Sequence, residues 1–486
     1  MIKSVFFENF RNLSGMFSFN SDVINVIFGK NNSGKSNLLD GIKLAFSVIN
    51  SDNYFKISKS DFKDSDDSMP IIIKVDLENH SIPTFDYFEN ENTERCGFKV
   101  VIKKMQNGKY VRDVFLYNGN NIDHDLLRNE DKIPNIYSVP LLRIEDIYTD
   151  DLSAKIEKFI DSEEKYKEIK EASKQAVKDE MSGKITKFQE FCEKFDQSFD
   201  IEISDPKFKN EKVFIVDKSG ECKEHNYKIG SGYKSIANII LNTLSEQYNI
   251  ILIDEIENHL HPNLIRTLIR ELRSIENTII IGTTHSPVVI NELKMDELID
   301  ISGMRVDNLD ERNVTKLNVF LHPGRNELML CDNLILVEGF TEELLLNSYL
   351  MKNNKNWTIV NVGGVMFEPY IELACLLNKK IVVISDTDIS LSRTLEKSSR
   401  FVNLESLCCS KHIKLIEMYN TLETDLYNNG FLEGLNDLIA EHHDHPEIFV
   451  AKSGKKTEIA LKLIENNIAL DNWHVIQEID NEFQCD

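Results

Sequence analysis

The segment from Gly29 to Ser36 constrains the fold of this chain more than any other feature of the sequence. It reads GKNNSGKS, which fits the pattern G-x-x-x-x-G-K-[ST], and it lies between the apolar run SDVINVIF and a helical pattern that starts near Leu38. In a strand, loop and helix arrangement the glycines let backbone N–H groups close on phosphate oxygens, Lys35 adds positive charge, and the Ser36 hydroxyl reaches Mg²⁺. We therefore predict a nucleotide-binding loop whose ligands are Gly29, Asn32, Gly34, Lys35, Ser36 and Asn37.

Two later predicted strands end in residues that a nucleotide site requires in addition to the phosphate-binding loop. Asp254 and Glu255 close the apolar run IILID, and His285 closes the run TIIIGTT. Asp254 can hold a metal ion through water, Glu255 can polarise an attacking water, and His285 lies at the end of the next strand, in reach of the same site. Taken alone, the acidic pair is equally typical of an exposed turn, and the loop could be a glycine-rich turn with a chance lysine. Together they indicate an ATP site.

A second group of carboxylates follows the predicted ATP site. Glu338 ends the apolar run LILVE and Glu342 follows one helical turn later, while Asp386 and Asp388 end the run KKIVVISD and its continuation TD. Adjacent parallel strands would bring all four side chains to one edge of a sheet. Carboxylates repel one another unless hard cations neutralise them, and an oxygen-only ligand set suits Mg²⁺ or Mn²⁺. Two such ions can activate water and stabilise the leaving oxygen in phosphodiester cleavage.

The composition limits where a polyanion could bind. The chain has 486 residues, of which 56 are Lys or Arg and 80 are Asp or Glu, so the net charge is −24. This negative charge argues against a chain-wide affinity for nucleic acid or anionic membrane. Any polyanion must therefore bind at a local site on the protein. The eight cysteines form no CxxC pair, which makes a zinc site and disulfides unexpected. No apolar run is long enough for a signal peptide or a membrane span, and we expect a soluble, cytoplasmic protein.

The pattern along the chain predicts four parts. Residues 1–150 form the first half of an ATPase head, with extra strands at IIIKVDL and FKVVIKK. Residues 151–205 alternate Lys and Glu around spaced apolar positions, which predicts a helical insertion in the form of a hairpin. Its spaced Ile, Phe and Ala offer an apolar stripe for dimerisation, and a monomeric hairpin folded back on its own head is the alternative. Residues 206–325 complete the head with parallel strands, and residues 326–486 form a further α/β unit.

The head motifs resemble those of a known family. ENFRNL, FGKNNSGKSNLLDGI, ILIDEIENHLHP and GTTHSP are similar to the ATP-binding-cassette ATPases of the recombination-and-repair type, the group with RecF-like and SMC-like heads. The resemblance implies that two heads enclose ATP and that a serine-glycine signature from one completes the site of the other. By similarity that signature is Gly230-Ser231-Gly232, with Ser231 and Gly232 as nucleotide ligands. It departs from the usual LSGGE-like form and could instead be a flexible helix cap.

The second carboxylate group resembles a Toprim module, with its strand-end Glu-Gly and its Asp-x-Asp. An ATPase head followed by a Toprim domain is similar to the overcoming-lysogenization-defect (OLD) family of nucleases, a resemblance that covers most of the chain except residues 51–205. It implies that a further glutamate and a lysine complete the site. The candidates are Glu423 and Lys455, with Lys452 or Lys456 as alternatives and helix-surface charges as the competing interpretation.

We therefore expect an α/β protein, an ABC-type P-loop ATPase head with a helical insertion followed by a C-terminal Toprim domain. The expected activity is an ATP-regulated, divalent-metal-dependent DNA endonuclease, either nicking or cutting both strands, with Glu338, Asp386, Asp388, Lys455 and Glu255 as catalytic residues. The expected metal ligands are Glu338, Glu342, Asp386, Asp388, Glu423, Ser36 and Asp254.

The expected partners are DNA and a second copy of the chain. The resemblance implies a dimer or larger homo-oligomer, and it extends to bacterial antiphage defence with a partner protein or nucleoprotein. One rival is a RecF-like, ATP-dependent DNA clamp with an inactive Toprim fold. A second rival is a strand-passing or priming enzyme, but the sequence leaves no region for a tyrosine-bearing DNA gate and no cysteine pattern for a zinc ribbon.

Overall fold

The computed structural model divides the chain into two compact units, residues 1–305 and 306–486. This division lies before the boundary at 325 that the sequence suggested, because helix α8 (Glu311–Val319) packs on α11 (Phe367–Leu376), where Asn313 Nδ2 donates to Glu372 Oε2 at 2.7 Å. The structure describes residues 2–20, 24–49, 56–77, 96–118, 121–123, 141–144, 186, 190, 199–203, 213–217, 231–244, 250–276, 278–303, 311–319, 323–364, 366–389, 396–441, 449–452 and 454–483.

Most of the expected helical insertion, residues 151–205, lies outside the described residues. At its end the chain forms strand β9 (Phe199–Ile203), which pairs antiparallel with β10 (Val213–Asp217), so this end of the segment is not helical. Among the described residues, no helix is long and apolar enough to cross a membrane.

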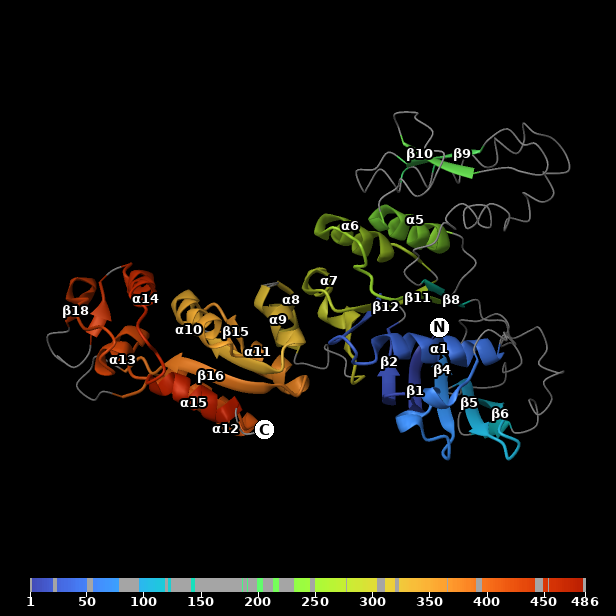
Figure 1. The fold of residues 1–486 in the computed structure, drawn as a ribbon, viewed down its shortest axis with the longest axis horizontal. Coiled ribbons are helices and arrows are strands. Elements are labelled where there is room, and N and C mark those ends of the chain that lie inside the picture. Colours follow the sequence, from blue (N-terminus) through green and yellow to red (C-terminus); the bar gives the residue numbers. More distant parts are fainter. Residues whose placement is uncertain are drawn as a thin grey trace. The chain divides into compact units, whose positions relative to one another are not determined.

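One layer of the N-terminal unit is an antiparallel sheet with the strand order β2-β1-β4-β5-β6-β7 (Figure 1). Strand β4 shows why it forms: Ile71, Ile73, Val75 and Leu77 are buried and the residues between them are partly exposed, which is the two-residue period of a half-buried strand. The strands are β1 (Ile2–Phe10), β2 (Leu13–Ser18), β4 (Ile71–Leu77), β5 (Cys96–Lys104), β6 (Tyr110–Asn118) and β7 (Asn121–Asp123).

The other layer is a parallel sheet with the order β13-β3-β12-β11-β8. Every residue of β3, β11 and β12 is buried, as expected for parallel strands covered on both faces. These strands are β3 (Asn25–Phe28), β8 (Leu141–Ile144), β11 (Ile250–Ile253), β12 (Ile279–Thr284) and β13 (Leu298–Asp300).

Helix α1 (Lys35–Ile49) joins the two layers into one core. Its buried residues Leu38, Leu39, Ile42 and Phe46 share a cluster with side chains from both sheets, and Phe46 meets Phe98 of β5 edge to face at a centroid distance of 5.2 Å. The helix that carries the predicted phosphate loop is therefore fixed from both sides.

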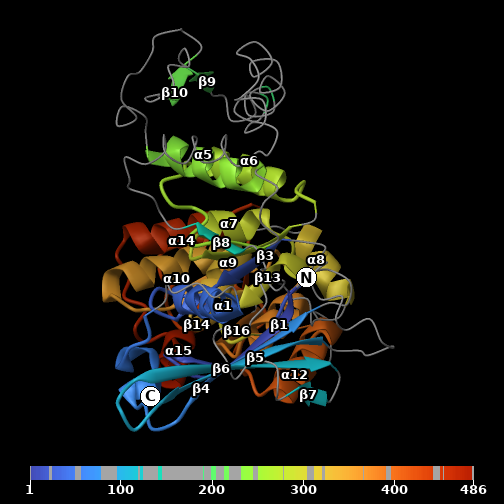
Figure 2. The ribbon, with the colours of Figure 1, turned by 90° about the vertical axis from the view of Figure 1, so that its right-hand side faces the viewer.

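Three further helices belong to this unit: α5 (Ser231–Leu244) precedes strand β11, α6 (Pro262–Leu272) follows β11, and α7 (Pro287–Glu292) follows β12. Helix α6 begins with Pro262 in its first turn, after the cap His261, and buries Ile265, Leu268, Ile269 and Leu272, the spacing of one helix face. Helices α5 and α6 lie side by side in both views (Figures 1 and 2). Short 3₁₀ turns occur at Lys59–Asp61, Lys63–Ser65 and Met295–Glu297.

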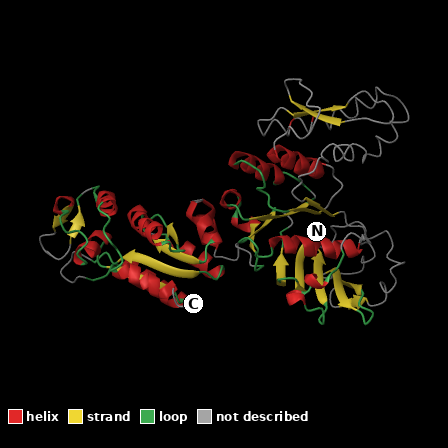
Figure 3. Ribbon diagram, in the orientation of Figure 1, coloured by secondary structure: helices red, strands yellow, loops and turns green. Residues whose placement is uncertain are grey.

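The C-terminal unit is built on a parallel sheet with the order β15-β14-β16-β17, and helices cover both of its faces (Figure 3). The strands are β14 (Asn333–Val337), β15 (Thr358–Asn361), β16 (Lys380–Asp386) and β17 (Lys414–Met418). The helices not yet named are α9 (Pro323–Leu330), α10 (Phe340–Asn353), α12 (Ser399–Lys411), α13 (Leu422–Asn428), α14 (Lys456–Glu465) and α15 (His474–Phe483). A 3₁₀ turn (Asn436–Leu438) precedes the short antiparallel pair β18 (Ile439–Glu441) and β19 (Phe449–Ala451).

Candidate active sites

The loop from Gly29 to Ser36 leads from β3 into α1, as the sequence predicted, although the helix begins at Lys35 rather than near Leu38. The Lys35 side chain is buried, and its Nζ donates to the Gly29 carbonyl at 2.8 Å and to the Lys30 carbonyl at 2.6 Å. Burial lowers the pKa of Lys35, against the opposing effect of Glu255, Glu257 and Asp254. The lysine is thus held inside the loop that would surround a phosphate.

The turn between β1 and β2 holds this loop from outside. Asn12 Nδ2 donates to the Ser33 carbonyl at 2.9 Å, and Asn37 Nδ2 donates to Asn12 Oδ1 at 2.8 Å. Gly34 has a φ of 107°, and a Cβ there would lie 2.5 Å from the Asn12 amide. Arg11 extends the network, donating through Nη1 to Asn37 Oδ1 at 2.7 Å. The sequence-based site set omitted Arg11 and Asn12, although both belong to the ENFRNL segment that signalled the family.

Asp254 and Ser36 meet as predicted. Asp254 Oδ1 accepts from Ser36 Oγ at 3.2 Å and from Thr283 Oγ1 at 2.7 Å. Thr283 Oγ1 also accepts from the Glu255 backbone N–H at 2.8 Å, and Glu255 has a left-handed φ of 50°. The hydroxyl of the fully buried Thr283 therefore fixes both acidic residues.

His285 is held by a carboxylate that the sequence interpretation missed. Its backbone N–H donates to Glu257 Oε1 at 2.8 Å, and its Nδ1 lies 3.2 Å from the same atom and 3.6 Å from Glu255 Oε1. Thr284 Oγ1 donates to Glu257 Oε2 at 2.7 Å. The sequence signal was the position of Glu257, two residues after Glu255 in the same turn.

The segment proposed as the signature lies at the start of α5. The helix begins at Ser231, and a Cβ on Gly232 would come within 2.4 Å of the His259 carbonyl oxygen, so glycine permits α5 to approach the turn before α6. Gly230 lies outside the described residues. The role of Ser231 and Gly232 toward the nucleotide of another head stays a prediction.

The strand-end carboxylates of the C-terminal unit also converge. Glu338 follows β14 and Asp386 ends the neighbouring parallel strand β16, and Glu338 Oε1 accepts from the Asp386 backbone N–H at 3.0 Å. The Ser385 hydroxyl donates to the same oxygen at 2.5 Å. This is the arrangement expected from two apolar strands that end in acidic residues.

Asp386 lies at the centre of the cluster. Its side chain is buried, and its Oδ1 has no hydrogen-bond partner among the residues that the structure describes. Burial raises its pKa well above the usual range, with further contributions from Glu338 and Glu342. Glu342 of α10 is also buried, and burial raises its pKa in the same direction. An unsatisfied buried carboxylate oxygen beside other carboxylates is the environment that a hard cation stabilises.

The lysine at this cluster is Lys456, not Lys455. Lys456 Nζ lies 3.4 Å from Oε1 of the buried Glu423, which comes from α13. Burial lowers the pKa of Lys456, but Glu423, Asp386 and Glu342 outweigh that effect and the net direction is upward. Lys455, the cap residue before α14, instead pairs with Glu458 of that helix, and Lys452 donates to the Asp437 carbonyl at 2.6 Å. One residue on a helix is a rotation of about 100°, which the sequence could not resolve among neighbouring lysines.

An arginine that the sequence interpretation missed completes the cluster. Arg400 of α12 donates from Nη1 to Glu338 Oε2 at 3.0 Å, from Nη2 to Glu338 Oε1 at 2.9 Å and from Nη2 to Asp388 Oδ2 at 2.6 Å. No local pattern marks Arg400, because it reaches the site only through the packing of α12 beside β17.

The five carboxylates fit Mg²⁺ or Mn²⁺ by the chemistry of their donors and by the unsatisfied Asp386 Oδ1. Their present spacing does not yet form a coordination site: among the described residues, no three acidic, histidine or cysteine side chains converge closely enough to hold a metal ion. The guanidinium of Arg400 occupies oxygens of both Glu338 and Asp388.

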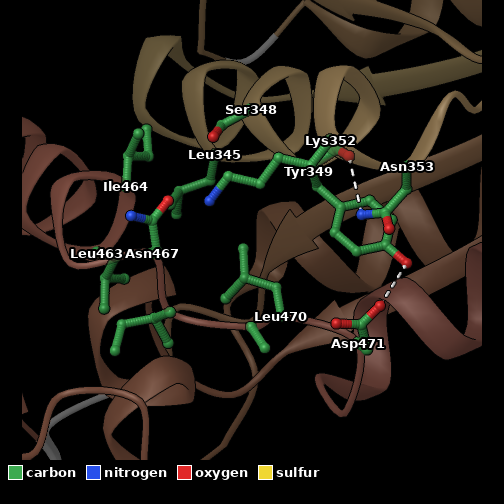
Figure 4. Close-up of a pocket in the computed structure, with 12 residues that line it drawn as sticks. Leu345, Ser348, Tyr349, Lys352, Asn353, Leu463, Ile464, Asn467, Leu470 and Asp471 are labelled. Atoms are coloured by element: carbon green, nitrogen blue, oxygen red, sulfur yellow. Dashed lines mark hydrogen bonds between the residues drawn. The ribbon is translucent and has the colours of Figure 1, made fainter.

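The C-terminal unit also contains a cavity of about 240 Å³, lined by α10 and by the end and following loop of α14 (Figure 4). Tyr349 Oη donates to Asp471 Oδ1 at 3.3 Å, and burial raises the pKa of Tyr349 to about 12. The cavity contains none of the predicted metal ligands, so it is separate from the carboxylate cluster.

Comparison with known families identifies both units. Residues 24–79 and 135–291 match an AAA domain family whose description also names the AbiEii toxin of type IV toxin–antitoxin systems. Residues 329–388 match the Toprim domain of overcoming-lysogenization-defect-like proteins. The expected fold class, an α/β P-loop ATPase head followed by a Toprim domain, is thereby confirmed.

Individual relatives are distant. Endonuclease GajA of Bacillus cereus (strain HuB5-5) is 22% identical, and the match covers 54% of this chain and 44% of that protein. Among solved structures, an SMC head bound to the C-winged helix domain of ScpA has a TM-score of 0.43 at 14% identity, covering 62% of this chain and 93% of that one. The SMC head domain from Thermotoga maritima has a TM-score of 0.36 at 13% identity, covering 62% and 94%.

Proposed function

We propose that this chain, which belongs to the overcoming-lysogenization-defect family of ATPase–Toprim proteins, is an ATP-regulated, divalent-metal-dependent DNA endonuclease. The observation that carries the proposal is the contact of Glu338 with Asp386, whose buried Oδ1 has no hydrogen-bond partner among the described residues, together with the electrostatic interaction of Lys456 with Asp386. The relative named endonuclease GajA supports the reaction class.

The metal ligands of the proposed site are Glu338, Glu342, Asp386, Asp388 and Glu423. When bound, Mg²⁺ or Mn²⁺ would activate water and stabilise the leaving oxygen of a phosphodiester. The protein's own contribution is to hold Asp386 through its backbone N–H on Glu338, and to place the Lys456 ammonium where it can stabilise negative charge on a scissile phosphate.

The head supplies the nucleotide dependence in this proposal. Lys35 and the loop amides would bind the β- and γ-phosphates, Ser36 and Asp254 would hold Mg²⁺, and Glu255 would position the attacking water. Loss of the Lys35 side chain should abolish nucleotide binding. Glu255→Gln should keep ATP bound and slow its hydrolysis, because only the water-positioning carboxylate is removed; equal loss of binding in both variants would mean that Glu255 is structural.

The proposed function also includes a dimeric assembly and a biological role. Two heads would enclose ATP, with Ser231 and Gly232 of one head completing the site of the other, and residues 151–205 would dimerise independently of nucleotide. Two Toprim sites on one DNA could then produce paired nicks. We further propose a cytoplasmic role in antiphage defence, with DNA as substrate and a partner protein or nucleoprotein of the same defence system. Light scattering of the full chain, with and without ATP, tests the dimer.

The decisive experiment compares Asp386→Asn with Asp471→Asn on supercoiled plasmid, with Mg²⁺ or Mn²⁺ and with or without ATP. Asp471 is an exposed residue that accepts from Tyr349 beside the cavity, and it serves as a carboxylate control in the same unit. Asp386→Asn should reduce nicking by about 100-fold or more, as expected when a metal ligand or charge-stabilising group is lost. ATP binding should be unchanged in both variants, and EDTA should act like Asp386→Asn.

The alternative function is a DNA clamp in which the Toprim fold is inert. The ion pairs of Arg400 with Glu338 and Asp388 favour it, because they occupy two of the expected metal ligands. In that case wild type and Asp386→Asn would bind DNA equally in the presence of ATP, and neither would nick the plasmid with either metal.

A further inference from the structure

The proposed reaction does not explain the role of Arg400, a residue that contacts the carboxylate cluster. Its guanidinium binds both oxygens of Glu338 at 2.9 and 3.0 Å and one oxygen of Asp388 at 2.6 Å. This is a two-pronged arrangement that a planar guanidinium makes and an ammonium does not. The Arg400 side chain is 31% exposed, so it reaches the cluster from the solvent side.

Among the residues that the structure describes, the charges around Arg400 are not balanced. Five carboxylates, those of Glu338, Glu342, Asp386, Asp388 and Glu423, face two cationic side chains there. Lys456 lies beside Glu423, whereas Arg400 lies against Glu338 and Asp388. A guanidinium supplies one positive charge where a divalent ion would supply two, and both compete for the same oxygens. The two cannot bind Glu338 in the same way at once.

We propose that Arg400 is a displaceable cation: it holds Glu338 and Asp388 together in the metal-free protein, and it gives way to a divalent ion and then binds a phosphate of the DNA. This inference rests on the proposed metal site and adds that Arg400 competes with the metal ion for the same carboxylate oxygens. The partial exposure of the side chain allows it to turn outward. The same fork that binds a carboxylate also matches phosphate oxygens, so the displaced guanidinium has a second anion to bind when DNA is present.

A purely structural ion pair would differ from this in one measurable way. If Arg400 only fastens α12 to the sheet, its removal would destabilise the unit and weaken metal binding through disorder of Glu338 and Asp388. If Arg400 competes with the metal, its removal would strengthen metal binding while destabilising only the metal-free protein. The direction of the change in metal affinity therefore separates the two roles.

The test is Mn²⁺ binding by calorimetry, without DNA and without nucleotide, on the full chain. Arg400→Ala should lower the Kd for Mn²⁺ at the carboxylate site about 10-fold, which corresponds to about 1.4 kcal/mol. Arg400→Lys keeps the charge but loses the fork and should lie between wild type and Arg400→Ala. Lys397→Ala is the matched control, because Lys397 precedes the same helix but pairs with Glu417 and Glu405, and it should leave the Kd within about twofold.

Melting temperature provides a second readout. Arg400→Ala should melt below wild type in EDTA and recover most of the difference in Mn²⁺, whereas Lys397→Ala should shift equally in both conditions. Arg400→Gln, which keeps the length and polarity of the side chain, replaces Arg400→Ala in every comparison if the alanine variant does not fold.

The phosphate half of the proposal is tested with a short DNA duplex in Ca²⁺, which occupies oxygen sites without supporting cleavage in the binding assay. Arg400→Ala should bind the duplex about 10-fold more weakly than wild type, and Lys397→Ala should not. Equal DNA affinity in Arg400→Ala and wild type would overturn the phosphate contact.

An unchanged or higher Kd for Mn²⁺ in Arg400→Ala would overturn displacement. Failure of the proposed function looks different. If wild type binds no Mn²⁺, or if Asp386→Asn binds it as well as wild type does, then the metal site itself is wrong. If Asp386→Asn loses Mn²⁺ binding and Arg400→Ala matches wild type, only the inference about Arg400 falls.

Discussion

Replacing Lys456 and Lys455 one at a time gives the sharpest test of the carboxylate site. The two lysines are neighbours at the start of α14, and each pairs with a glutamate. Their environments differ: the side chain of Glu423, the partner of Lys456, is 4% exposed, whereas that of Glu458, the partner of Lys455, is 39% exposed. Lys455→Ala is therefore a matched control for Lys456→Ala.

The expected change in unfolding free energy follows from the distance between Lys456 and Glu423 and from the exposure of the Lys456 side chain. Two unit charges at the 3.4 Å that separates Lys456 Nζ from Glu423 Oε1 attract by about 5 kcal/mol at an effective dielectric constant of about 20. Solvent screens this interaction because the Lys456 side chain is 55% exposed, so we expect Lys456→Ala to cost about 1–3 kcal/mol of unfolding free energy. Lys455→Ala removes a surface pair within one helix and should cost about 0–0.5 kcal/mol.

The expected effect on DNA nicking is larger. Lys456 pairs with Glu423 and interacts electrostatically with Asp386, and loss of such a charge at a phosphoryl site should slow nicking by about 100-fold or more. Lys455→Ala should nick within about twofold of wild type. ATP binding by the head should be unchanged in both variants, since both changes lie in the C-terminal unit.

Tryptophan fluorescence can measure the stability term for one unit alone. The chain has two tryptophans, Trp357 and Trp473, and both belong to the C-terminal unit. Urea unfolding followed by their emission, together with plasmid nicking on the same preparations, gives both quantities. Equal losses in the two variants, or a larger loss in Lys455→Ala, would refute the assignment of Lys456 to the site.

Three further outcomes are expected. The two carboxylate oxygens of Glu257 accept one hydrogen bond each, from the His285 N–H and from the Thr284 hydroxyl, and the amide of Glu257→Gln has only one oxygen to accept them. The kcat for ATP hydrolysis should therefore fall about 10-fold, with ATP affinity nearly unchanged. Thr283→Val keeps the shape of the side chain but removes the hydroxyl that bonds both Asp254 and the backbone N–H of Glu255. The unfolding free energy of the head should therefore fall by about 2 kcal/mol, measured by nucleotide-dependent melting. The hydrogen bond to Asp425 raises the pKa of His474 above 6.5. The stabilisation of the folded state by protonated His474 is therefore full below about pH 6.5 and is lost as pH rises through the folded-state pKa. The fluorescence-detected melting temperature should fall over that pH range in wild type and fall less in His474→Gln.

The sequence predicted those parts of the fold that local pattern determines. The strand before Gly29, the helix after it, and the strands at 71–77 and 96–104 are present, and the acidic ends of β11, β14 and β16 lie where apolar runs ended. The start of α1 was placed late because its first turn, Lys35, Ser36 and Asn37, contains no apolar residue to begin a helical period.

The parts that were missed depend on packing between distant segments. Arg400 reaches Glu338 from a different helix, and no spacing rule links them. Lys456 rather than Lys455 contacts Glu423 because of the rotation at which α14 packs on α10, which the sequence does not encode locally. Glu257 was visible in ENHLHP, but its role appears only when the turn folds back on β12.

The strand order of the parallel sheet has a consequence for the synthesis of the protein. Val26 of β3 pairs with Gly282 of β12 and Leu298 of β13, so the strand that leads into the phosphate loop has no sheet partner until those strands leave the ribosome. At roughly 5–20 residues per second, the intervening stretch of about 250 residues takes on the order of 10–50 s to translate. Strands β1, β2, β4, β5 and β6 lie within residues 2–118 and can pair during that interval. The nascent chain thus presents an unpaired β3, with the apolar residues Val26, Ile27 and Phe28, as a natural target for chaperones, and the nucleotide pocket, although encoded first, is among the last parts of the head to be completed.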